Sequence, residues 1–114
     1  MYAGDQDFIC NFEGNTRWTD SMVWAGAAAY AKATPTEWLV DGVPAGSAKS
    51  AAGLTMLRVY GAGCAPSAPA ANVCALTDSS PANASSFHSH MVPMDQPKAA
   101  LDMLQRFMDG TAWA

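Results

Sequence analysis

The run LTMLRVYGAG, residues 54–63, constrains the fold more than any other part of the chain. Its apolar side chains are nearly continuous and two glycines close it, which is typical of a buried strand that leads into a loop. The opening residues YAG have the same character and run into the polar turn GDQD. The segment EWLVDGVPAG adds two short apolar arms around Asp41-Gly42, a pair that strongly predicts a hairpin.

A helix is predicted over about residues 15–32, between the first strand and the hairpin. Apolar or small residues recur there every three to four positions, which is the helical period. Asn11 or Asn15 can cap its start, and Pro35 stops it.

A second helix is predicted after the last strand. Pro97 suits its first turn, and Gly110 ends it. One apolar face is predicted on this helix, made by Ala100, Leu101, Leu104, Phe107 and Met108.

Size and charge exclude several classes of protein. With 114 residues, the chain is at most one small domain or a part of a larger one. Its net charge of −4 and pI near 4.7 argue against a nucleic-acid partner, which calls for a basic surface. No apolar run reaches the roughly 18 residues of a membrane span. Because YAG reads as the end of a strand, we expect residue 1 to be an internal point of a longer protein.

The three cysteines do not form a recognisable metal or redox motif. Cys64 and Cys74 lie in one Ala/Pro/Ser-rich stretch, Cys10 stands alone, and no CxxC pair occurs. Cys10 can be a small buried hydrophobe. His88 and His90 can place two rings on one side of a strand, but no third ligand is evident, so the sequence disfavours a zinc site.

An acid that follows one strand and a histidine that follows the next give the chain order of the α/β-hydrolase triad, whose serine comes earlier. The segment YAGDQDFICNFEGNTRW resembles the aspartate-bearing segment of serine carboxypeptidases. The segments LTMLRVYGAG and HMVPMDQPKAALDML resemble the part that bears their catalytic histidine. The resemblance implies an α/β fold: the last strands of an α/β-hydrolase sheet with flanking helices, as a C-terminal fragment of one domain over residues 1–114.

The resemblance also implies site residues. Asp7 matches the triad aspartate and His90 the triad histidine. Ile9 and Cys10 match the pocket for the side chain before the scissile bond, and Met91 matches the pocket for the departing residue. On this match Cys10 is a free thiol that reacts with mercurials.

Two neighbouring residues compete with the matched pair. Asp5 is the alternative carboxylate to Asp7, and we interpret it as a turn residue that bonds local amides. His88 matches nothing in the family, so His90 is favoured over it.

The implied activity is removal of single C-terminal amino acids from peptides and proteins through an acyl-enzyme, without metal or cofactor. The family suggests a vacuolar, lysosomal or secreted location. No G-x-S-x-G occurs, so the serine and the oxyanion donors are expected outside this chain. Two alternatives stay open: a carboxypeptidase-like acyltransferase, and a non-catalytic fragment.

Residues 64–89 interrupt the resemblance, because removing them joins RVYGAG directly to HMVPMDQP. Codons for Gly63-Cys64 can supply a GT donor, and those for His88-Ser89 an AG acceptor. Excision then restores a glycine codon and keeps the reading frame. We interpret the segment as a retained intron, with a genuine surface insertion as the alternative.

Overall fold

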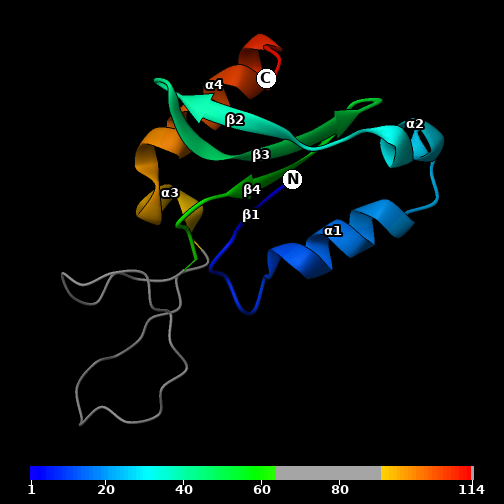
Figure 1. Ribbon diagram of the computed structural model, residues 1–114, viewed down its shortest axis with the longest axis horizontal. Helices are drawn as coiled ribbons and strands as arrows, with labels where there is room; N and C mark the ends of the chain where they lie inside the picture. The colour runs from blue at the N-terminus through cyan, green and yellow to red at the C-terminus, as the bar shows by residue number, and fades with distance from the viewer. Residues whose placement is uncertain (64–90, 114) are drawn as a thin grey trace, which may run out of the picture.

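The computed structural model describes residues 1–63 and 91–113. Within them, four strands form one mixed sheet in the order β1-β4-β3-β2 (Figure 1). β1 runs parallel to β4, and β3 is antiparallel to both of its neighbours. The strands are β1 (Tyr2–Gly4), β2 (Thr36–Val40), β3 (Val43–Ala51) and β4 (Leu54–Val59). The helices are α1 (Phe12–Ser21), α2 (Ala27–Lys32), α3 (Val92–Asp95) and α4 (Pro97–Asp109).

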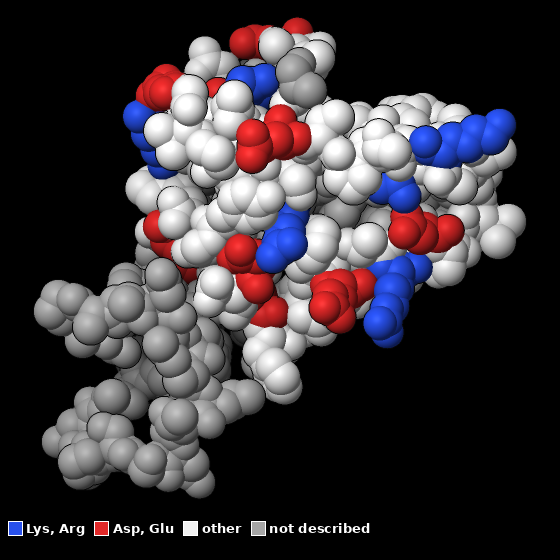
Figure 2. Space-filling model, viewed as in Figure 1, with Lys and Arg blue, Asp and Glu red and all other residues white. Residues whose placement is uncertain are grey.

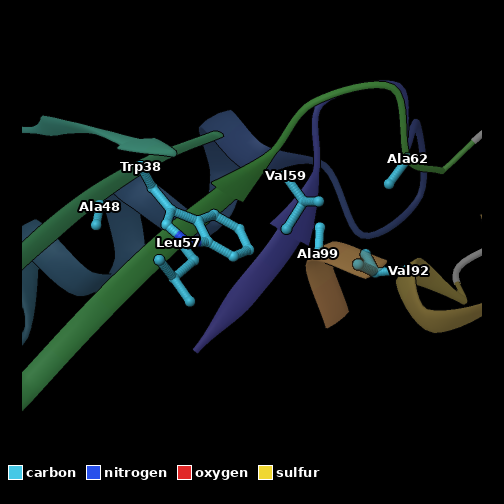
Figure 3. Packing of buried hydrophobic residues seen from close by; sticks show 7 residues of the cluster. All are labelled: Trp38, Ala48, Leu57, Val59, Ala62, Val92 and Ala99. Atoms are coloured by element: carbon cyan, nitrogen blue, oxygen red, sulfur yellow. The ribbon is translucent and has the colours of Figure 1, made fainter. Parts of the chain in front are cut away.

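Helices α3 and α4 cover one face of the sheet. The centre of this layer is Trp38, which is fully buried and lies in one cluster with Leu57 and Val59 (Figure 3). Val92 of α3 and Ala99 of α4 close the cluster. The packing on this face therefore holds the β2–β3 hairpin against β4, which precedes residues 64–90, and against α3 and α4, which follow them.

Helices α1 and α2 cover the opposite face. Ala3 and Met56 from the sheet pack there with the buried ring of Tyr30 in α2, and Phe12 of α1 packs against them. A sheet with helices on both faces is an α/β layer architecture, so the predicted α/β fold is confirmed.

The hairpin at Asp41-Gly42 is confirmed. Both residues have positive φ, 50° and 77°, as a two-residue turn of type I′ requires. A second hairpin that the sequence did not predict follows, with β3 continuing to Ala51 and a turn at Ala52-Gly53. The part of β3 that belongs to this second hairpin is made of small and polar residues, so no apolar alternation marks it in the sequence.

The single helix predicted over residues 15–32 is wrong, because residues 22–26 are not helical and separate α1 from α2. The Trp24 ring lies over Gly26, so close that a Cβ there would be 2.1 Å from the ring. The same ring meets Tyr30 edge-on at 6.5 Å between centroids. This packing requires the chain to leave the helix before Trp24. Asn11, one of the two predicted caps, does cap α1, since its Oδ1 accepts the Gly14 N–H at 2.6 Å.

Helix α4 has the predicted ends, and Gly110 follows it in the left-handed conformation. Its predicted apolar face does not pack on the sheet: Leu101, Leu104, Phe107 and Met108 are exposed. The side facing the sheet instead carries Ala99 and Met103, which pack on the core cluster, and polar contacts add to this packing. The Trp38 Nε1–H donates to Asp102 Oδ2 at 2.8 Å, and Arg106 Nε donates to the same oxygen at 2.7 Å.

Candidate functional site

The turn after β1 and the turn after β4 lie against each other at one edge of the sheet. Because β1 and β4 are parallel, their carboxyl ends meet at this edge. The Asp5 N–H donates to the Val59 carbonyl at 3.0 Å, and the Gln6 N–H donates to the Ala62 carbonyl at 2.9 Å. The turn that carries both candidate carboxylates is therefore hydrogen-bonded directly to the turn after β4, residues 60–63, which we call the glycine turn.

Asp7 is the buried carboxylate of this turn, with 7% of its surface exposed. Its Oδ1 accepts the Ile9 N–H at 3.0 Å and the Cys10 N–H at 2.9 Å. Two hydrogen bonds to one oxygen fix the direction of the carboxyl group. A buried, oriented carboxylate on a loop at a sheet edge can hold and stabilise a neighbouring imidazolium.

Asp5 has a different environment. Its Oδ1 accepts the Gly61 N–H at 2.8 Å, and its Oδ2 lies 3.6 Å from Arg58 Nη2. The predicted bonding to a local amide is wrong, because Gly61 is 56 positions away in the chain. The carboxylate of Asp5 ties the two turns together.

Gly63 packs on the backbone of Asp7. Its φ is +103°, and a Cβ at this position would lie 2.5 Å from Asp7 N and 2.7 Å from Asp7 Cα. Only glycine allows this approach without displacement. Gly63, at the end of the glycine turn, is therefore part of the surface on which Asp7 packs, which we call the seat of Asp7.

Helix α3 joins the same cluster from across residues 64–90. The Gly63 N–H donates to Asp95 Oδ2 at 2.8 Å, and Gln96 Nε2 donates to the Gly61 carbonyl at 3.2 Å. These bonds hold the two flanks of the segment at one place. Asp95 was not predicted from the sequence, where its only signal is an acidic residue two positions before Pro97 in HMVPMDQP.

The candidate pocket residues are accessible. Ile9 is 66% exposed and Met91 59% exposed, and Cys10 is an exposed free thiol. The alternative that Cys10 is a buried hydrophobe is therefore wrong. His90, His88, Cys64 and Cys74 lie outside the described residues.

Residues 1–63 and 91–113 contain no group of three His, Cys, Asp or Glu side chains placed to hold a metal ion. No helix in these ranges is long and apolar enough to cross a membrane. Figure 2 shows Lys and Arg interspersed with Asp and Glu over the face in view. Lys49 and Asp20 form an ion pair, with 2.7 Å between Nζ and Oδ1.

Comparisons with known proteins agree with this picture. A family model described as serine carboxypeptidase matches residues 1–79. Serine carboxypeptidase 3 of Triticum aestivum is 42% identical over 110 residues, 96% of this chain. Serine carboxypeptidase-like 47 of Arabidopsis thaliana shows the same identity, and carboxypeptidase Y of Candida albicans is 37% identical. The chain spans only 16–17% of the length of these relatives. The chain belongs to the serine carboxypeptidase family.

Proposed function

We propose that this chain is the C-terminal part of a serine-type carboxypeptidase and carries two members of its catalytic triad, Asp7 and His90. The observation that carries the proposal is the buried carboxylate of Asp7, whose Oδ1 accepts two backbone hydrogen bonds. It lies at the edge of the sheet where the carboxyl ends of β1 and β4 meet. The glycine turn that leads toward His90 along the chain packs on this carboxylate residue.

In the proposed reaction, His90 takes the proton of a serine hydroxyl supplied by another part of the enzyme. The serine oxygen attacks the last peptide carbonyl, and His90 then protonates the departing amino acid. Water resolves the acyl-enzyme by the same route. Asp7 keeps the imidazole in the correct tautomer and stabilises its charged form.

The exposed apolar side chains beside Asp7 suit substrate contacts. Ile9 and Cys10 lie two and three positions after Asp7, and we assign them to the side chain before the scissile bond. We assign Met91 to the departing residue. Their exposure supports these roles, because a wall of a pocket has to be reachable from solvent. Peptide and protein C-termini are the substrates proposed, and family membership favours a vacuolar, lysosomal or secreted location.

The proposal is tested with the full-length protein made from its mature transcript. We expect release of single C-terminal amino acids from an N-blocked peptide, and complete inactivation by a fluorophosphonate, which phosphonylates the serine oxygen with loss of fluoride. A matched assay with a glucose ester as acyl donor separates the acyltransferase alternative. Transfer to an alcohol without peptide hydrolysis would overturn the carboxypeptidase proposal, and neither activity would favour a non-catalytic protein.

For residues 64–89 we propose a retained intron. Two hydrogen bonds support this: the Gly63 N–H donates to Asp95, and Gln96 donates to the Gly61 carbonyl. They hold the glycine turn and the end of α3 together without using any residue of the segment. We expect the mature transcript to join Gly63 directly to His90. Sequencing of the spliced transcript tests this, and a transcript that always retains these codons would establish a genuine insertion.

A further inference from the structure

We propose that Asp95 is a positioning residue for the carboxylate of Asp7. Asp95 ends α3 and touches neither Ile9 nor Cys10 through any bond of the described residues, but its Oδ2 accepts the Gly63 N–H at 2.8 Å. Gly63 in turn packs on the backbone of Asp7. The carboxylate of Asp95 thus acts on Asp7 through one intervening residue.

The hydrogen bond from Gly63 to Asp95 is partly buried. A hydrogen bond to a charged acceptor in such a place is stronger than one between neutral groups. Gly63 has a positive φ of 103°, which glycine adopts without strain, and its lack of a Cβ leaves its peptide conformationally free, so an external partner is needed to keep that peptide oriented. Asp95 supplies that partner from the far side of residues 64–90.

The contact has a consequence for the whole site. Asp7 belongs to the turn after β1, whereas Met91 begins the segment that leads into α3. Asp95 lies one helical turn after Met91, whose carbonyl accepts the Asp95 N–H at 3.2 Å. The Asp95–Gly63 bond therefore couples the position of the aspartate turn to the position of the segment that follows His90.

This inference rests on the proposed role of Asp7, and its test has a readout that does not depend on activity. In the full-length enzyme, we expect Asp95→Ala to lower kcat about tenfold, the equivalent of one lost charged hydrogen bond. Backbone hydrogen exchange of residues 5–10, including the Ile9 and Cys10 amides that bond Asp7, should become faster. Exchange in β3 and β4 should stay unchanged.

Two further variants make the test specific. Asp95→Asn keeps an oxygen that accepts the Gly63 N–H, so it should restore slow exchange and most of the lost rate. Lys49→Ala removes a side-chain bond of the same length range, to Asp20, outside the glycine turn and the Asp7 turn, so kcat should stay within about twofold. Unchanged exchange in Asp95→Ala, or an Asp95→Asn as impaired as Asp95→Ala, would overturn the inference. Faster exchange in an enzyme that never hydrolyses peptides would instead refute the proposed function.

Discussion

Asp7→Asn is expected to lower kcat/KM for peptide hydrolysis by about 10⁴-fold in the full-length enzyme, the cost of the same change in other serine triads. Oδ1 of Asp7 accepts two backbone N–H groups, and the amide oxygen of Asn can take over both bonds. The amide NH₂ then occupies the other position and donates where the carboxylate accepted. In the proposed triad, this forces the His90 imidazole into the wrong tautomer, in which it cannot act as a base. Steady-state kinetics and a thermal melt of both proteins check the result.

Asp5→Asn is the matched control, since it makes the same change in the same turn. Its amide oxygen can still accept the Gly61 N–H. The Arg58 contact that it weakens is long, at 3.6 Å, and the Arg58 side chain is 41% exposed, so little stability depends on it. We expect kcat/KM within about threefold of the unaltered enzyme. A loss as large as that of Asp7→Asn would assign the triad role to Asp5.

Local patterns were enough to predict the strands that carry the site. The apolar run of β4, the short β1 and the Asp41-Gly42 turn each have a signal within a few residues. The second hairpin lacked such a signal. Ala48 in β3 is buried because neighbouring elements cover it, whereas the residues around it are small or polar and show no apolar alternation. The break between α1 and α2 depends on where the Trp24 ring packs, and helical periodicity carries no information about that.

The candidate site was predictable only in part for the same reason. Motifs pointed to Asp7, but the sequence offered two carboxylates in one turn, and only the structure shows that Asp7 is buried while Asp5 binds the opposite turn. The bond between Gly63 and Asp95 spans 32 positions and has no periodic or local signature. The seat of Asp7 is thus a tertiary feature, built by three segments that lie apart in the chain.

Gly63→Ala is expected to lower kcat/KM by about a hundredfold or more, because it inserts an atom into the seat of Asp7. A Cβ at residue 63 would lie 2.6 Å from Asp7 Cβ and 2.5 Å from Asp7 N, distances that only a shift of one backbone can relieve. The glycine turn is bonded to Asp5, Gln6 and Asp95, so it cannot withdraw without breaking these bonds. A displacement of about 1 Å at a catalytic group costs about a hundredfold in rate.

Gly53→Ala separates this collision from backbone strain alone. Gly53 also has a positive φ, +85°, but a Cβ there meets nothing within 4 Å. Both substitutions should therefore cost about 1–3 kcal/mol of stability through strain. Only Gly63→Ala should change kcat/KM, and Gly53→Ala should stay within about twofold. Equal losses of activity in the two variants would mean that strain spreads through the sheet to Asp7. Full activity in Gly63→Ala would mean that the glycine turn yields without moving Asp7, and that the bonds from the Ile9 and Cys10 amides hold the carboxylate in place without the packing of Gly63.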